Sequence, residues 1–219
     1  VVGLLVASAI REKEPEQVKV SSEKRPLFKV TNLGPLMIVS VIAAFAQYAN
    51  WSTIYGFSPI KAVDLGATKP ALGVLTMLAA TSNVLGLIVG NFAAERFGPR
   101  ITITLSLLLA ALSVLWVPFI HSLPILGVSQ MLTGFAAGAA FPVLMGLSIR
   151  DVPQTERATS MGIYQATYAL GMFLGPILAG RIADSFGLNS AFFFTSAVCL
   201  LGSFLTLRGI SSRKPAAAS

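Results

Sequence analysis

The chain has few charged residues, one cysteine and one histidine. Charged residues make up 11% of its 219 residues, whereas a soluble domain carries roughly 25%, so the composition excludes an ordinary soluble domain. Cys199 has no second cysteine with which to form an internal disulfide. His121 stands alone, and no nucleophile has a base near it in sequence. We therefore expect no metal site and no cofactor, and the protein is not expected to be an enzyme.

Long apolar runs take the place of the missing charge. Hydrophobic residues make up 54% of the chain, and a membrane-spanning helix needs about 20 predominantly apolar residues. Six stretches meet this length or come near it: Leu33 to Phe57, Ala71 to Phe92, Ile101 to Ile120, Leu123 to Ile149, Ala158 to Gly180 and Ala191 to Leu207. Short connections join them, the longest being Ser58 to Pro70. The sequence predicts an all-α, polytopic membrane helix bundle.

The remaining segments give the expected domain organisation. Residues 1–10 are apolar but too short to span, so we expect them to be the end of an upstream transmembrane helix. Residues 11–31 are polar and mixed in charge, as in a cytoplasmic linker. Residues 32–210 are expected to form the six-helix membrane unit, and residues 211–219 a cytoplasmic tail.

A five-residue pattern occurs twice, 89 residues apart. Ala94-Glu95-Arg96-Phe97-Gly98 returns as Ala183-Asp184-Ser185-Phe186-Gly187, each time between two apolar segments. Three apolar segments lie between the copies, and an odd number of crossings places the two loops on opposite membrane faces. This predicts an inverted 3+3 helix repeat, which is typical of secondary transporters.

The basic residues are distributed unevenly between the two sides of the predicted bundle. Thirteen of the 16 Arg and Lys fall on the side of the linker and the C-terminus. Because basic residues collect on the cytoplasmic side, we expect both segments to lie in the cytoplasm and the bundle to lie in the plasma membrane. This asymmetry also accounts for the net charge of +7, so we expect no nucleic acid partner.

Asn and Gln occur in the first, second, fourth and fifth apolar stretches and not in the third or sixth. A carboxamide facing lipid would leave its polar atoms unsatisfied, so the four stretches should surround an interior, with the other two bracing them. The candidate substrate-binding residues are polar or aromatic: Gln47, Asn50, Trp51, Tyr55, Gln130, Thr133, Tyr164, Gln165 and Tyr168. The alternative is that the aromatic residues belong to the interfacial belt or to helix packing.

Small residues at four-residue spacing predict close helix contacts. Glycines at this spacing let helix backbones approach each other in lipid, and a proline inside a helix frees a backbone carbonyl and permits bending. The residues concerned are Gly134, Gly138, Pro142, Gly171, Gly175 and Pro176. Static packing is the alternative to a gating motion.

Charged residues at the ends of the apolar stretches are candidates for gate contacts. They are Glu95, Arg96, Arg100, Arg150, Arg157 and Asp184. Glu95 is expected to meet Arg150 or Arg157, and Arg96 or Arg100 to meet Asp151 or Glu156, through charge-assisted bonds. The alternative is a set of solvated loop pairs worth about 0 to 1 kcal/mol.

The loop motif and a glycine-proline run carry a family resemblance. The stretch Asn91-Phe-Ala-Ala-Glu95-Arg96-Phe-Gly98-Pro-Arg100 resembles the major facilitator superfamily motif glycine-x-x-x-aspartate-arginine-x-glycine-arginine-basic. Asn91, Glu95 and Pro99 depart from it. The run Gly171-Met-Phe-Leu-Gly175-Pro176 is similar to the family's motif in the fifth helix of a half.

The resemblance implies that the six stretches are helices seven to twelve of a twelve-helix permease, with residues 1–10 the end of helix six. The implied partners are a missing N-terminal six-helix half, the lipid bilayer and a small-molecule substrate. The favoured function is secondary active transport of a small organic solute by alternating access, with efflux, proton-coupled or not, ahead of uptake. The alternatives are an uptake permease for a nutrient such as a sugar or organic acid, and a passive channel or non-transporting scaffold.

The asymmetry of basic residues predicts the topology in cells. After Cys199 is replaced by Ala, single cysteines at Ser22 and Ser211 should resist an impermeant thiol reagent in intact cells, and one at Ser122 should react. If the cysteines at Ser22 and Ser211 were labelled from outside, the predicted topology would be wrong, and the two sides would be exchanged.

Overall fold

The computed structural model describes residues 33–210. These residues are almost entirely helical, and no strand occurs among them. In chain order the elements are α2 (Leu33–Asn50), the π-helix η1 (Trp51–Phe57), α3 (Ser58–Asp64), α4 (Lys69–Phe97), α5 (Pro99–Trp116), η2 (Val117–Phe119), α6 (Leu123–Arg150), η3 (Gln154–Glu156), α7 (Arg157–Phe186) and α8 (Leu188–Gly209). The predicted segments 1–10, 11–31 and 211–219 lie outside the described residues.

Six helical stretches are long and apolar enough to cross a membrane, which confirms the predicted all-helical membrane bundle. The first of them differs from the expectation. It runs without a break from Leu33 to Asp64, so the predicted connection Ser58 to Pro70 is wrong over its first half, which is the helix α3. Pro59 lies just after the π-helix η1, in the first turn of α3.

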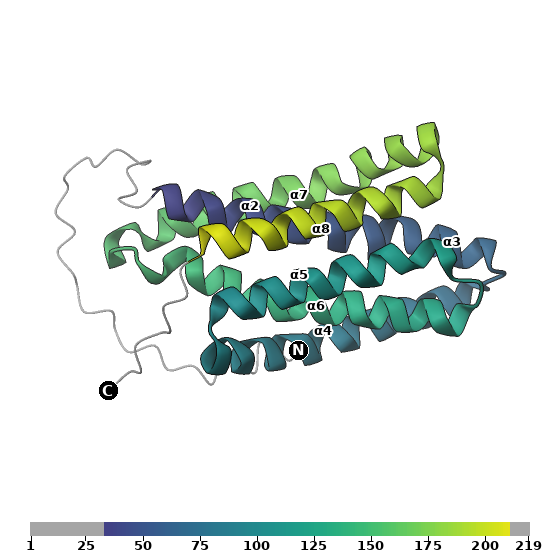
Figure 1. Ribbon diagram of the computed structural model, residues 1–219, viewed down its shortest axis with the longest axis horizontal. Coiled ribbons are helices and arrows are strands. Elements are labelled where there is room, and N and C mark those ends of the chain that lie inside the picture. The colour runs from purple at the N-terminus through teal and green to yellow at the C-terminus, as the bar shows by residue number, and fades with distance from the viewer. Residues whose placement is uncertain (1–32, 211–219) are drawn as a thin grey trace, which may run out of the picture.

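Two groups of three helices build the bundle, with α2, α7 and α8 above α4, α5 and α6 in Figure 1. The most extensive contacts join α4 to α6, α2 to α7 and α5 to α8. The first repeat consists of α2, α4 and α5, and the second of α6, α7 and α8. When each helix is replaced by its counterpart in the other repeat, the α4–α6 pair becomes the α7–α2 pair, and the α5–α8 pair becomes itself. The packing therefore has the symmetry of the inverted repeat, in agreement with the fold class that the sequence predicts.

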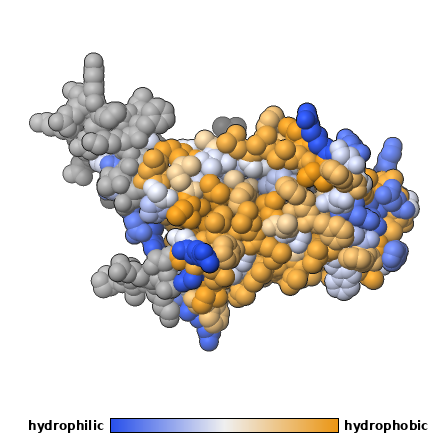
Figure 2. Space-filling view, turned by 45° about the horizontal axis from the view of Figure 1, so that its top comes forward, coloured by the Kyte–Doolittle hydropathy of each residue, from blue (hydrophilic) through white to orange (hydrophobic). Residues whose placement is uncertain are grey.

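The surface has the pattern of a membrane protein. Hydrophobic side chains cover the middle of the face shown in Figure 2, and hydrophilic residues gather toward its ends. Large apolar side chains such as Phe92, Leu112 and Phe173 are more than 60% exposed, which is suited to lipid rather than to water.

The two copies of the repeated pattern end their helices in the same way. Gly98 follows α4 with φ +91° and Gly187 follows α7 with φ +86°. Each donates its N–H to an alanine of its own copy, at 3.0 Å to the Ala94 oxygen and 2.8 Å to the Ala183 oxygen. Only glycine adopts this positive φ without strain, so both copies keep glycine there.

Glycines bring two pairs of helices into backbone contact. In the α4–α6 seam, a Cβ at Gly86 or Gly90 of α4, or at Gly134 or Gly138 of α6, would collide with the main chain of the other helix. In the α2–α7 seam, a Cβ at Gly171 would collide with the main chain of Ala44, and one at Gly175 would lie 3.0 Å from the Tyr48 carbonyl oxygen. The two prolines interrupt neither helix, since α6 and α7 continue through Pro142 and Pro176.

The α4–α6 seam predicts a difference between two glycines of α6. Gly138→Ala should lower the stability of the bundle by about 1–3 kcal/mol, because the new methyl group meets the Asn83 main chain, which has no room to move. Gly146→Ala should be neutral or slightly stabilising, since nothing lies within 4 Å of its Cβ position. Thermal unfolding of the two purified variants measures the difference, and equal melting temperatures would contradict the seam.

Candidate functional site

Four of the six spans surround a cavity of about 300 Å³. Its lining comes from the first span (α2 with η1) and from α4, α6 and α7: Ala43, Ala46, Gln47, Asn50, Trp51, Asn83, Leu87, Ala137, Phe141, Leu144, Tyr168 and Met172. No residue of α5 or α8 lines it. These are the four spans in which the sequence places Asn and Gln, and the lining contains no charged residue.

Three carboxamides form the polar part of the lining. Gln47 and Asn50 come from α2, and neither side chain is hydrogen-bonded to another described residue. Asn83 comes from α4, and its Nδ2 donates to the Gly134 carbonyl oxygen of α6 at 3.1 Å. Asn83 therefore borders both the cavity and the α4–α6 seam.

Aromatic rings form another part of the lining. The Tyr168 ring stands edge-on to Phe141 with ring centres 5.7 Å apart, and to Tyr164 at 5.3 Å. Trp51 lies at the start of the π-helix η1 and also lines the cavity. Aromatic faces and edges bind flat organic rings through stacking and edge-to-face contacts, while carboxamides supply hydrogen bonds. The arrangement is suited to an amphipathic organic molecule.

The structure places four of the nine candidate substrate-binding residues at this cavity, namely Gln47, Asn50, Trp51 and Tyr168. Tyr55 is 53% exposed and packs against Trp51 with ring centres 5.0 Å apart. The expectation that Tyr55 shares the face of Asn50 assumes α-helical geometry. The segment that carries it is a π-helix, in which more residues fill each turn and the side chains rotate to other faces.

The other four candidates also lie away from the cavity lining. Gln165 is exposed on α7, and Gln130, Thr133 and Tyr164 are buried in the bundle. Thr133 borders a separate void of only about 10 Å³. Gln130 stands two turns before Ala137 on α6.

Some lining residues were not among the sequence candidates. The sequence could have indicated Asn83, since it is a carboxamide within an apolar stretch. Phe141 and Met172 had none, because an aromatic or methionine side chain in a membrane helix looks the same in sequence whether it faces lipid, a neighbouring helix or a cavity.

Of the gate candidates, Glu95 and Arg150 border the same groove, but among the described residues no ion pair joins Glu95 to Arg150 or Arg157. Glu95 and Arg150 line this groove, of about 430 Å³, between the ends of α4 and α6, together with Asn91 and Pro142. Arg150 also contacts the Asp151 carboxylate at 3.4 Å. The groove therefore holds one carboxylate and one guanidinium.

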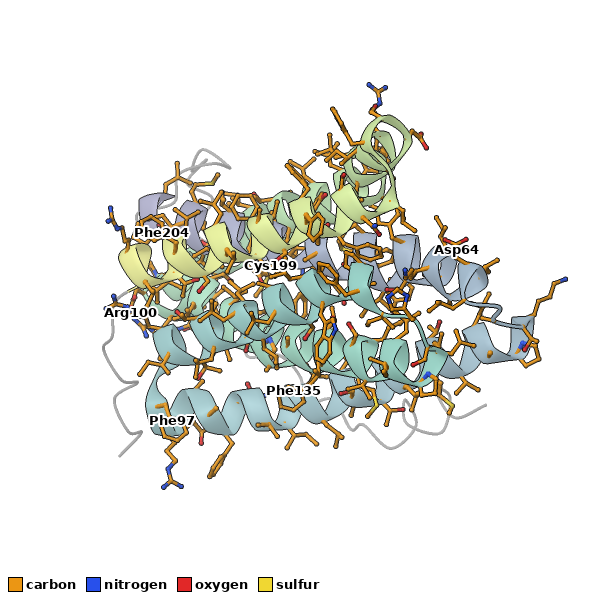
Figure 3. The ribbon with its side chains drawn as sticks, turned by 45° about the vertical axis from the view of Figure 1, so that its right-hand side comes forward. Asp64, Phe97, Arg100, Phe135, Cys199 and Phe204 are labelled. Atoms are coloured by element: carbon orange, nitrogen blue, oxygen red, sulfur yellow. The ribbon has the colours of Figure 1, made fainter. Side chains whose placement is uncertain are left out.

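Arg100 does not follow the expected pairing with Asp151 or Glu156. Its guanidinium donates to the Leu207 carbonyl oxygen near the end of α8, where a cation is attracted by the helix dipole. Figure 3 shows Arg100 at the end of the bundle that also carries Phe97 and Phe204.

The remaining gate candidates are spread over both ends of the bundle. Arg157 donates from Nε to the Val152 carbonyl at 3.4 Å, and the Arg96 guanidinium lies 5.6 Å from the centre of the Phe97 ring. Asp184 is exposed on the last turn of α7. That turn lies at the opposite end of the bundle from the first copy of the repeat.

Comparisons with known proteins agree with one another. Residues 40–219 match the family described as Major Facilitator Superfamily. The chain is 27% identical over 149 residues to the quinolone resistance protein NorA of Staphylococcus aureus, covering 68% of this chain and 38% of NorA. It is 26% identical over 157 residues to the 4-hydroxybenzoate transporter PcaK of Acinetobacter baylyi, covering 72% of this chain and 34% of PcaK.

Among solved structures, the xylose transporter XylE from E. coli, in an inward-open conformation, matches with a TM-score of 0.61 and 15% identity. The match covers 80% of this chain and 45% of XylE. The chain thus spans less than half of the length of each of these proteins.

The two tryptophans of the chain allow the cavity to be tested without a ligand. Trp116 is 62% exposed on α5, whereas Trp51 lines the cavity. In bilayers containing brominated lipids, fluorescence should be quenched strongly in a Trp51→Phe variant, which retains Trp116, and weakly in a Trp116→Phe variant, which retains Trp51. Equal quenching of the two would place Trp51 at the lipid surface and contradict the cavity.

Proposed function

The chain belongs to the major facilitator superfamily, and from this premise we propose that it forms half of a secondary active transporter for a small organic solute. Membership of this family makes it a transporter component rather than an enzyme. The observation that supports the proposal most directly is the cavity of about 300 Å³ between the first span, α4, α6 and α7. A binding site at the interface of inverted repeats near the middle of the membrane is what alternating access requires.

The proposed solute is an aromatic organic molecule with hydrogen-bonding groups. Support comes from the cavity, whose described lining combines three carboxamides with Trp51, Phe141 and Tyr168 and carries no charge. The names of two relatives agree with it, since quinolones and 4-hydroxybenzoate are both aromatic.

The proposed direction is efflux, in line with the resistance protein among the relatives. Uptake is the second candidate, because PcaK is named for a compound that it transports and XylE for a sugar. Every Asp and Glu among the described residues lies at a helix end or in a connection. We therefore propose that a proton-coupling carboxylate, which belongs within the membrane, is contributed from outside residues 33–210.

The proposed partner is a second six-helix half, supported by the share of the relatives that this chain covers. The distribution of Arg and Lys supports a location in the plasma membrane with residues 11–31 and the C-terminus in the cytoplasm. Glu95 and Arg150, which line one groove, are proposed as gate residues whose contacts differ between the two states of the carrier. Bending at Pro142 and Pro176 is proposed to accompany the change of state.

Flux into proteoliposomes tests the proposal. When the full-length protein with both six-helix halves is reconstituted, a fluorescent quinolone or radiolabelled 4-hydroxybenzoate should move at a rate that saturates with concentration and depends on an imposed ion gradient. Asn50→Ala and Trp51→Ala should each lower the rate about tenfold, the effect of losing about 1.4 kcal/mol of binding. Ser113→Ala, on α5 and away from the cavity, should leave it unchanged.

Several outcomes would contradict the proposal. A rate that rises linearly with concentration and ignores the gradient would indicate a passive channel. Flux of neither probe would exclude the aromatic solute. In the same assay Glu95→Gln should change the rate, because removing a contact made in only one state of the carrier shifts the equilibrium between its states. A rate equal to that of the wild type would show that Glu95 is not a gate residue.

A further inference from the structure

The two inverted repeats contribute different chemistry to the cavity. Positions in α4 and α7 correspond at an interval of 89 residues, as in the repeated pattern, so Asn83 corresponds to Met172. Both residues line the cavity. One repeat therefore presents a carboxamide where the other presents a thioether.

The same contrast holds between α2 and α6. Gly86 of α4 corresponds to Gly175 of α7, and these two glycines contact Phe135 of α6 and Tyr48 of α2. Tyr48 therefore corresponds to Phe135, so equivalent positions in α2 and α6 are 87 residues apart. Asn50 then corresponds to Ala137, and both line the cavity.

All three carboxamides in the described lining thus come from the first repeat. The second repeat supplies only apolar and aromatic residues, namely Ala137, Phe141, Leu144, Tyr168 and Met172. The polar group of an amphipathic molecule in this cavity is therefore favoured beside a carboxamide of the first repeat, because the side chains of the second repeat offer few hydrogen bonds.

The Asn83 side chain is less free to rotate than those of the other two carboxamides. A carbonyl oxygen only accepts hydrogen bonds, so the bond of 3.1 Å to the Gly134 oxygen holds Nδ2 of Asn83 against α6. The main chain of Asn83 is also in contact with Gly138 in the seam. The side-chain oxygen is left as the acceptor that Asn83 has to offer, whereas Gln47 and Asn50 can rotate to present either end.

We propose that Asn83 accepts a hydrogen bond from a donor group on the solute and so orients it, with this group toward the Asn83 side-chain oxygen. This inference rests on the proposed function, since it assumes that the cavity binds an aromatic solute. It narrows the solute class to aromatic molecules that carry a hydroxyl or N–H group. Asn83 is then a specificity-determining residue, in addition to its contact across the seam.

A matched pair of probes tests the inference. Naphthylamine carries an N–H donor and its N,N-dimethyl derivative does not, while both are aromatic and uncharged near neutrality. Equilibrium binding of radiolabelled probes to the purified protein in nanodiscs should favour naphthylamine about tenfold, since the methylated probe leaves the Asn83 oxygen without a donor. In Asn83→Leu, which keeps the volume of the side chain, the two probes should bind equally well.

Gln47→Met is the control at a free carboxamide. It should weaken the binding of both probes by a similar factor and keep the preference, because Gln47 can turn either its oxygen or its nitrogen toward a ligand. Persistence of the preference in Asn83→Leu, equal binding of the two probes by the wild type, or loss of both probes from Asn83→Leu would overturn the role of Asn83. Binding of neither probe by the wild type would instead overturn the proposed aromatic solute, and the orientation with it.

Discussion

The backbone contact between α4 and α6, and its counterpart between α2 and α7, is the constraint on which the cavity depends. In a bilayer no hydrophobic force draws helices together, so their association relies on close packing and on hydrogen bonds between helices. Gly86, Gly138 and Gly171 permit this packing, because a Cβ at any of these positions would collide with the main chain of the partner helix. Ser82 and Asn83 add hydrogen bonds across the α4–α6 seam, to the carbonyl oxygens of Met131 at 2.7 Å and Gly134 at 3.1 Å.

The seams also decide which side chains face the interior. With α4 held against α6 and α2 against α7, the four helices bring Gln47, Asn50 and Asn83 of the first repeat and Phe141, Tyr168 and Met172 of the second repeat to one cavity. Carboxamides are costly in hydrocarbon, so their place at a shared cavity is consistent with a binding role. The α5–α8 pair lies outside this ring and is joined by hydroxyl bonds such as that from Ser196 to the Ala111 oxygen at 2.9 Å.

Much of the fold could be predicted from the sequence, because a bilayer limits a chain to a few solutions. Six apolar stretches gave six spans, and the paired patterns ending at Gly98 and Gly187 gave the inverted repeat, whose two glycines adopt the same conformation. The site was harder to predict. The predicted position of Tyr55 was wrong because no residue near it in the sequence indicates a π-helix. The predicted partner of Arg100 was wrong because its acceptor is the main-chain oxygen of Leu207, a group that every residue has.

We propose above all that the described cavity binds an aromatic solute whose hydrogen-bond donor is held by Asn83. An experimental structure of the protein in a lipid nanodisc with naphthylamine bound is its most direct test. We expect density for the probe in the cavity, with its nitrogen within hydrogen-bond distance of the Asn83 oxygen and its ring beside Tyr168 and Met172. A probe bound against α5 and α8, or one that lies in the cavity with its nitrogen toward Met172, would contradict it.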